Sequence, residues 1–377
     1  MRPTPATSVI GAVLLFGATA CGGPGSAAMG QGTGAIAVEA TDTECKVERT
    51  EAAAGTIEFT VRNKGGKVNE FYLLGEGDQV LGEVENITPG LTRTFHVQVA
   101  EPGTYTTACK PGMRGSGLRG EFTVTGSSAA ARSTDEKLAA AVEKYEAYVA
   151  GQSDELLTRT GEFVALVKSG KVEQAKALYP VARGPWERIE PVAESFGDLD
   201  PMIDGREDVV QEGLAFTGFH RLEKDLWVSG LQPDSAKIAD KLLADVTDIV
   251  ATAKAVELNP LQLANGSKAL LDEVATGKIT GEEDRYSHTD LYDFDENYRG
   301  CKAAIDALRP ALKERDPELV AAIDARFAAL DVELDQHRTD GGFKPYTALS
   351  RAEVRELTVK LDAVSEQVAR VAGVVAT

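Results

Sequence analysis

The spacing of hydrophobic residues changes once along this chain. From residue 35 to about residue 125, apolar and polar residues alternate with a period of two. The alternation is clearest in three short runs, residues 56–61, 94–99 and 120–124. Because every second side chain of a strand lies on the same face, this pattern is typical of a sheet with one buried side. Turn signals such as Thr88-Pro89-Gly90 separate the runs, and the whole segment predicts a small β-sandwich.

From residue 133 onward the period becomes 3.6, which predicts helices. Ser133 or Thr134 can cap the first helix, which opens near Glu136. The helical runs that follow are residues 154–169, 172–179, 186–196, 209–227, 235–257, 260–276, 292–308, 318–334 and 350–371. Gly, Pro, Asp or Asn stands at the breaks between them, as expected at helix ends. The pattern predicts an all-α domain of about eight to ten helices, packed as a bundle.

The first 21 residues have the features of an export signal. Arg2 supplies positive charge, and residues 9–16 form an apolar run that is too short to span a bilayer. Residues 18–21 resemble a lipobox, in which a lipidated Cys21 becomes the mature N-terminus. The small residues before Cys21 also suit ordinary signal peptidase. Both routes predict an exported protein, either anchored by lipid to the outer face of the cell membrane or periplasmic.

These patterns divide the chain into five segments. They are a signal peptide (1–21), a flexible Gly- and Ser-rich tether (22–34), a β domain (35–126), a linker (127–134) and a helical domain (135–377). No segment after the signal is long and apolar enough to predict a transmembrane helix.

The net charge narrows the class of partner. The chain carries 40 Lys and Arg against 59 Asp and Glu, which gives a net charge of −19. A charge of this sign repels nucleic acid and attracts cations, so no nucleic-acid partner is expected. The alternative is that the negative charge serves solubility alone.

His220 and Glu223 are the most informative pair of residues in the helical domain. The chain has only four histidines, and this one lies three residues before an acid in the predicted helix 209–227. That spacing puts both side chains on one helical face, where they can bind one cation. A catalytic pair and a buried ion pair are the other interpretations of the same spacing.

Acidic residues that precede this pair in the sequence offer further ligands. Glu187 and Glu190 share a helical face, and Pro191 is expected to kink that helix beside them. Asp204 and Glu207 share a face if their segment is helical. Carboxylates around one imidazole suit iron, manganese or zinc better than calcium. The alternative is a solvated acidic surface, with His220 making one hydrogen bond in the core.

Known catalytic motifs do not match this chain. Zinc peptidases use His-Glu-x-x-His or His-x-x-Glu-His, and Lys224 stands where the inverted motif needs its second histidine. Di-iron bundles use Glu-x-x-His twice, whereas the order here is reversed and occurs once. The sequence therefore favours a protein that holds a metal over an enzyme.

The β domain has its own candidate ligands. Cys109 and Met113 lie in the last loop before a final strand, where blue-copper domains place ligands. A blue-copper site also needs two histidines, and His96 is the only one in this domain. A different metal site from Cys45, Glu70, Cys109 and Met113 is one hypothesis. The other is a Cys45–Cys109 disulfide, which closes a loop of roughly sixty residues and stabilises by about 4 kcal/mol.

Three further residues have structural interpretations. Asp290 lies in a loop before a predicted helix and is expected to cap it, with a ligand role for Asp290 or His288 as the alternative. His337 lies near Gly341 and Gly342 and is expected at the surface. Cys301 lies in a helical pattern and is expected to be a buried free thiol.

Four phrases of the chain carry a family resemblance. They are residues 109–113, 186–191, 218–223 and 286–291. In this order they resemble the EfeO family of bacterial iron uptake components. The resemblance implies a cupredoxin-like sandwich followed by an imelysin-like domain of two packed four-helix bundles. It also implies a membrane iron permease and a haem-type peroxidase as partners.

The resemblance implies iron, as Fe2+ or Fe3+, as the ion bound in the helical domain. His220 and Glu223 map onto its His-x-x-Glu motif, with Glu187, Glu190, Asp204 and Glu207 as the acids that complete the site. It also implies a second metal site at Cys45, Glu70 and Cys109, where copper, zinc or iron could bind.

The function expected from these observations is capture of iron outside the cytoplasm and its delivery to a membrane permease. Two alternatives belong to other classes. One is a metallopeptidase, because imelysins are filed as a peptidase family. The other is a polysaccharide-binding surface lipoprotein, because some imelysin-like relatives are linked to alginate.

Overall fold

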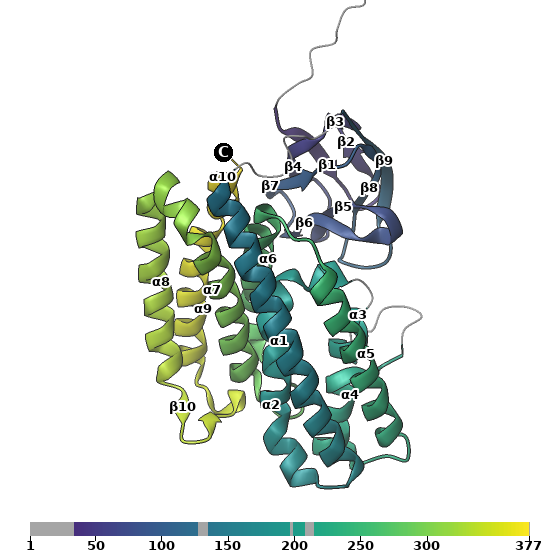
Figure 1. Ribbon diagram of the computed structural model, residues 1–377, viewed down its shortest axis with the longest axis vertical. Coiled ribbons are helices and arrows are strands. Elements are labelled where there is room, and N and C mark those ends of the chain that lie inside the picture. The colour runs from purple at the N-terminus through teal and green to yellow at the C-terminus, as the bar shows by residue number, and fades with distance from the viewer. Residues whose placement is uncertain (1–33, 127–134, 197–198, 208–214, 377) are drawn as a thin grey trace, which may run out of the picture. The chain divides into compact units, whose positions relative to one another are not determined.

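The computed structural model describes residues 34–126, 135–196, 199–207 and 215–376. The predicted signal peptide with Cys21, the tether up to residue 33, the linker 127–134 and the first part of the predicted helix 209–227 lie outside the described residues. Strands fill the first described range, and helices fill most of the rest. Figure 1 shows the strands in purple and blue near the N-terminus and the helices in teal, green and yellow. The predicted order of a β domain and an all-α domain is confirmed.

The described β domain consists of two sheets that face each other. Its strands are β1 (Ile36–Ala40), β2 (Cys45–Val47), β3 (Glu51–Ala53), β4 (Gly55–Asn63), β5 (Asn69–Leu74), β6 (Val80–Ile87), β7 (Thr92–Val99), β8 (Gly103–Cys109) and β9 (Leu118–Thr125). One sheet has the order β2-β1-β4-β7 and the other β3-β9-β8-β5-β6. The three alternating runs of the sequence lie in β4, β7 and β9. Strand β5 is buried along its whole length and therefore shows no alternation.

Aromatic rings and a disulfide join the two sheets. Phe59 lies between Phe71, Phe95 and Phe122, with ring centroids 5.2–5.5 Å apart. Cys45 of β2 is bonded to Cys109 of β8, so the bridge links the two sheets. Of the two hypotheses for these cysteines, the structure contains the disulfide.

The helical domain begins with one long helix. Its α-helices are α1 (Glu136–Lys168), α2 (Val172–Ile189), α3 (Leu199–Asp204), α4 (Gly218–Lys224), α5 (Ser235–Ala255), α6 (Pro260–Thr276), α7 (Asp290–Arg315), α8 (Pro317–Asp335), α9 (Arg351–Val368) and α10 (Val371–Val375). Short 3-10 segments are η2 (Glu190–Phe196), η4 (Lys278–Thr280) and η5 (Tyr346–Ala348), and η3 (Asp225–Ser229) is a π-helical turn. A small hairpin, β10 (Arg338–Thr339) with β11 (Gly342–Phe343), follows α8. None of the described helices is long and apolar enough to cross a membrane.

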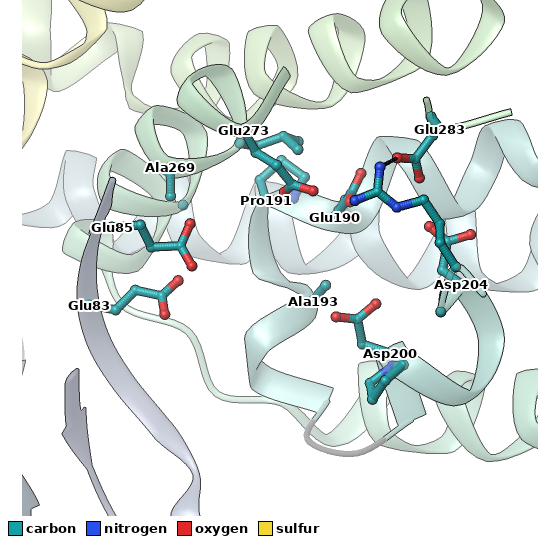
Figure 2. A pocket seen from close by; sticks show the side chains of 15 residues that line it. Glu83, Glu85, Glu190, Pro191, Ala193, Asp200, Asp204, Ala269, Glu273 and Glu283 are labelled. Atoms are coloured by element: carbon teal, nitrogen blue, oxygen red, sulfur yellow. Dashed lines mark hydrogen bonds and ion pairs between the residues drawn. The ribbon is translucent and has the colours of Figure 1, made fainter. Parts of the chain in front are cut away.

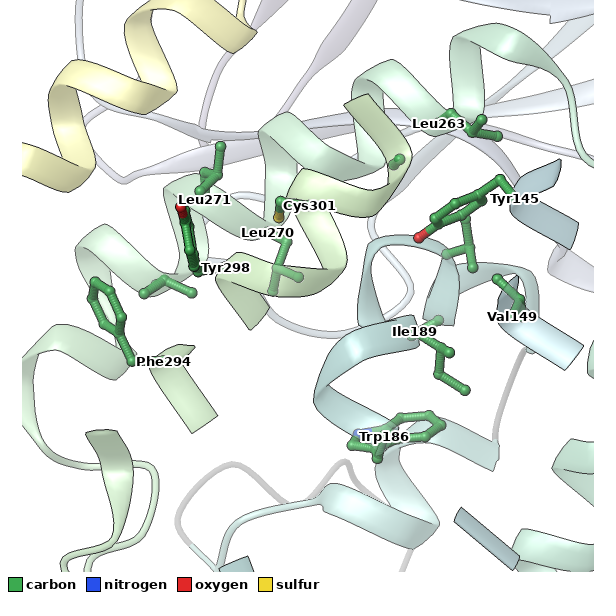
Figure 3. Close-up of a cluster of buried hydrophobic side chains, with 14 of the residues drawn as sticks. Tyr145, Val149, Trp186, Ile189, Leu263, Leu270, Leu271, Phe294, Tyr298 and Cys301 are labelled. Carbon is green, nitrogen blue, oxygen red and sulfur yellow. The ribbon is translucent and has the colours of Figure 1, made fainter. Parts of the chain in front are cut away.

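The helices pack as two groups that share α7. In the first group, α1 lies against α2 and α5, and α4 lies against α5. In the second group, α6 packs on α7 and α9, and α8 packs on α7 and α9. Helix α7 also contacts α1 and α2, which joins the groups. Figure 3 shows side chains of this shared interior, which include Trp186 and Ile189 of α2, Leu270 of α6, and Tyr298 and Cys301 of α7.

Two predicted helix boundaries are wrong. The sequence placed a break between residues 179 and 186, whereas α2 runs through both Pro180 and Pro185. Residues 182–187 are all buried, and this packing outweighs the backbone hydrogen bonds that the two prolines remove. The sequence expected Pro191 to kink a helix that continues to residue 196, whereas α2 ends at Ile189 and residues 190–196 form the 3-10 segment η2.

Three single-residue predictions have mixed outcomes. Cys301 is a buried free thiol, as predicted. His337 is only 2% exposed and not a surface residue, because it lies at the end of α8 within reach of Glu333. Asp290 is the first residue of α7 and not its cap, since Thr289 holds the capping position. The Asp290 carboxylate instead accepts a hydrogen bond from the backbone N–H of Asp284.

Candidate metal centre

A glycine places the helix that carries the His-x-x-Glu pair. Gly218, the first residue of α4, has a φ of +77°, and a Cβ here would lie 2.1 Å from the carbonyl oxygen of Ile203. Only glycine fits so close to the last turn of α3. His220 and Glu223 follow on one face of α4 and are both buried. The π-helical turn η3 comes directly after α4, and such turns occur often beside functional sites.

The Nδ1 atom of His220 faces three oxygen atoms from other side chains. Glu223 Oε2 lies at 3.2 Å, Tyr179 Oη at 3.4 Å and Asp284 Oδ1 at 3.8 Å. The Tyr179 hydroxyl also donates a hydrogen bond of 2.9 Å to Asp284. His220, Glu223 and Asp284 are close enough together to hold one metal ion.

The Nε2 atom of the same ring faces a second set of groups. Asp204 Oδ1 and Glu283 Oε1 each lie at 3.5 Å, and these two with His220 form a second triad that could hold a metal. A guanidinium nitrogen of Arg183 lies at 3.1 Å from Nε2 and also bonds to Asp204. The cation position on this side of the ring is therefore occupied by Arg183.

Two buried cations compensate the acids around the imidazole. Arg183 has no exposed surface, and carboxylates within 4 Å of its guanidinium come from Glu187, Asp204, Glu283, Asp284 and Asp293. Lys278 is also buried and lies 3.0 Å from Glu187 and 2.7 Å from Glu190. Charges buried this deeply are stable only when they are paired in this way.

The structure brings some of the predicted acids to His220 and holds others elsewhere. Asp204 reaches the imidazole. Glu187 and Glu190 lie in the adjoining network, where both contact Lys278 and the amide of Asn297. Glu207 is partly exposed and bonds to Lys224 and to the hydroxyl of Tyr286, not to His220.

Sequence reasoning missed several residues of this site. They are Tyr179, Arg183, Lys278, Glu283 and Asp284. Glu283 and Asp284 lie in the run of three acids at residues 282–284, just before the phrase 286–291. This acidic run was the only feature of the sequence that could have marked Glu283 and Asp284 as site residues. It does not share a helix with His220, so helical spacing could not relate the two. Tyr179 and Arg183 lie four residues apart on α2, which points both at the site.

A pocket of about 250 Å³ reaches the Nε2 side of the site. Figure 2 shows acidic side chains from strand β6 and from the helical domain lining it. The carboxylates on its wall belong to Glu83, Glu85, Glu190, Asp200, Asp204, Glu273 and Glu283. Asp204 and Glu283 thus face both the pocket and the imidazole. An acidic wall of this kind raises the local concentration of cations.

The environment keeps the imidazole of His220 protonated. Burial and the charge of Arg183 oppose the imidazolium, but Asp204, Glu223 and Glu283 outweigh them and raise the pKa of His220 to about 10. Burial alone would also raise the pKa of Glu283, yet Lys278 and His220 hold it well below its usual value. The site without a metal is therefore a network of paired charges.

These charges predict a pH dependence of stability in metal-free buffer. The pKa of His220 rises from 6.5 in the unfolded chain to about 10 in the folded chain. Its stabilising contribution is therefore complete below about pH 6.5 and lost as the pH rises to about 10. We expect the difference in unfolding free energy between the wild type and His220→Gln, measured by urea titration, to shrink by a few kcal/mol over this range. A constant difference would contradict the prediction.

The candidate ligands of the β domain are arranged differently. The sulfur atoms of Cys45 and Cys109 are bonded to each other. Glu70 is buried and accepts a hydrogen bond of 3.0 Å from the hydroxyl of Tyr72, while Met113 is 45% exposed. Within residues 34–126, no three His, Cys, Asp or Glu side chains lie close enough together to hold a metal.

The fold agrees with comparisons to known proteins. The family model described as Imelysin matches residues 141–371, and the one described as Cupredoxin-like domain matches residues 9–124. These matches and the fold define a class, in which a cupredoxin-like β-sandwich precedes an imelysin helical domain. The chain belongs to the imelysin family, in the form that carries a cupredoxin-like domain before the helical one.

The curated relatives share nearly the whole chain. The iron uptake system component EfeO of Escherichia coli O1:K1 / APEC is 38% identical over 345 residues, which cover 90% of this chain and 91% of that protein. The protein of the same name from E. coli strain K12 is 37% identical with the same coverage. A crystal structure of reduced auracyanin from Roseiflexus castenholzii is 18% identical, with a TM-score of 0.21 over 24% of this chain and 95% of that one. The resemblance seen in the sequence is confirmed by the EfeO relatives.

Proposed function

We propose that this protein is an extracytoplasmic iron-binding component of a bacterial iron uptake system. It captures iron at the site around His220 and delivers it to a membrane permease. The observation that carries this proposal is the buried imidazole with two carboxylates within 4 Å of each ring nitrogen. A set of one nitrogen and several oxygen donors suits iron. Copper(I) prefers soft thiolate ligands, and calcium prefers oxygen ligands alone.

The acidic pocket concentrates cations beside the site in this proposal. Its carboxylates attract cations from solution, and Asp204 and Glu283 at its inner end already contact the imidazole. The names of the E. coli relatives support iron as the ion. Iron is here the cargo of the protein and not a resident cofactor.

Export and anchoring belong to the same proposal. The apolar run 9–16 and Cys21 support a lipoprotein signal, which would hold the protein at the outer face of the membrane. A permease and a haem-type peroxidase of the same uptake system are the proposed partners. Uptake through a permease requires release of the ion, which the competing charges of Arg183 and Lys278 favour.

We propose that the site does not act as a peptidase. A general base needs a free carboxylate oxygen near a metal-bound water. Glu223 Oε1 instead accepts hydrogen bonds from the backbone N–H groups of Tyr286 and Ser287 at 2.9 and 2.7 Å. Its other oxygen faces His220.

Calorimetric titration with iron tests the proposal. We expect His220→Ala to lower the affinity at least about a hundredfold, because it removes the only nitrogen donor of the site. His96→Ala is the control, since this half-buried ring of the β domain lies on β7, where Glu58 is 3.9 Å away. Unchanged affinity in His220→Ala, or equal losses in both variants, would refute the assignment.

A further inference from the structure

We infer that the ion binds on the Nδ1 side of His220, and that Tyr179 and Asp284 are ligands together with His220 and Glu223. This inference rests on the proposed function and deepens it. Neither Tyr179 nor Asp284 is marked by any sequence motif. The set contains one imidazole nitrogen, two carboxylate oxygens and one phenol oxygen.

Four of the distances among these donor atoms are close to those of a coordination shell. Ligands about 2.0–2.2 Å from one ion lie roughly 3–3.6 Å from one another. Around His220 Nδ1, the oxygens of Glu223, Tyr179 and Asp284 lie at 3.2, 3.4 and 3.8 Å. The oxygens of Tyr179 and Asp284 are 2.9 Å apart. These four distances therefore need to change by only a few tenths of an ångström for the donors to surround an ion.

Both carboxylates are held in place by their second oxygen. Glu223 Oε1 is fixed by the backbone N–H groups of Tyr286 and Ser287, which leaves Oε2 directed at the imidazole. Asp284 Oδ2 accepts a hydrogen bond from the hydroxyl of Thr289, which leaves Oδ1 for the ion. Ligands oriented in this way lose little freedom when the ion binds.

The Nε2 side does not offer a comparable position. The Arg183 guanidinium, which stays charged in proteins, lies 3.1 Å from Nε2 and bonds to Asp204. An ion placed there would have to displace this buried side chain from its carboxylates. With the ion on Nδ1, the Nε2–H group faces the carboxylates of Asp204 and Glu283, which is the usual outer support of a metal-bound histidine.

The ligand set points to ferric iron. Two carboxylates and a phenolate carry three negative charges, which match Fe3+ and exceed the charge of a divalent ion. Phenolate and carboxylate oxygens are hard donors and bind trivalent iron strongly. On binding, the Tyr179 oxygen and His220 Nδ1 each form a bond to Fe3+, and the hydroxyl proton and the Nδ1 proton both leave for solvent. No electron is transferred in this step.

Visible absorption of the iron-loaded protein tests the inference. The full-length protein is titrated with Fe3+ supplied as ferric nitrilotriacetate, and a phenolate-to-iron charge-transfer band is expected in the wild type. Tyr179→Phe should lose this band and weaken Fe3+ binding at least about tenfold. The variant keeps the ring that packs against Phe219 and Trp227, so the helices should remain folded. Tyr298→Phe is the control, because this buried hydroxyl of α7 bonds to the backbone carbonyl of Phe327 and not to His220.

The outcomes separate this inference from the proposed function. Iron bound by the wild type without the band would overturn the role of Tyr179 and leave the proposed function intact. A band that survives in Tyr179→Phe would overturn it as well. If the wild type binds no iron at all, the proposed function fails and the inference fails with it. Loss of the band in Tyr179→Phe alone, with phenolate modes in the resonance Raman spectrum of the wild type, is the supporting result.

Discussion

Replacing Arg183 with methionine should destabilise the metal-free helical domain by about 3–5 kcal/mol. Arg183 is fully buried and is the shared partner of several carboxylates, among them Glu187 and Asp204. Without the guanidinium, these acids keep their desolvation penalty and lose their main compensation. A methionine replaces most of the volume, so the effect is electrostatic and not that of a cavity. The loss should diminish at low pH, where the acids become protonated.

Urea unfolding monitored by tryptophan fluorescence measures the stability of the helical domain. The chain has two tryptophans, Trp186 and Trp227, and both lie in the helical domain. Arg159→Met is the matched control, because Arg159 is an exposed partner of Glu155 and Glu162. Exposed ion pairs contribute at most about 1 kcal/mol. Equal effects of the two substitutions would show that the buried network does not depend on Arg183.

Removing the disulfide should destabilise the β domain by about 4 kcal/mol. Cys45 and Cys109 are 64 residues apart, and the bridge limits the unfolded conformations of the loop between them. It also ties β2 of one sheet to β8 of the other. The double variant Cys45→Ser, Cys109→Ser should therefore show faster hydrogen exchange throughout β4–β8. Its tryptophan unfolding transition should change little, since that signal comes from the helical domain.

Cys301→Ala is the control for the loss of sulfur as such. Cys301 is buried and free in α7, so its replacement removes one sulfur atom without opening a bridge. Exchange in β4–β8 should stay at the wild-type rate. If the double variant exchanges no faster than this control, the disulfide does not stabilise the domain.

Much of the fold was predictable because it depends on local patterns. The change of hydrophobic period separated the two domains, and the alternating runs of β4, β7 and β9 identified a sandwich. Strand β5 lacks alternation because both of its faces are buried. Helix α2 continues through Pro180 and Pro185 because tertiary packing outweighs two lost backbone hydrogen bonds. Local rules cannot include such packing.

The candidate site was also predictable only where it depends on local spacing. Spacing within one helix placed His220 and Glu223 on one face, and that relation holds in α4. Glu283 and Asp284 come from a segment about sixty residues later in the chain, and Tyr179 and Arg183 come from α2. Nothing in the sequence tells which of 59 acidic residues meet one imidazole.

The sequence by itself determined the domain order, the position of His220 and Glu223 on one helical face and the family to which the chain belongs. Each of these depends on residues that are neighbours in the chain or in one helix. Only the tertiary structure decided that Arg183 occupies the Nε2 side of His220, and that Tyr179 and Asp284 lie beside Nδ1. The reason is that contacts between α2, α4 and the segment before α7 follow from the packing of the whole bundle. The spacing of residues within one segment does not predict that packing.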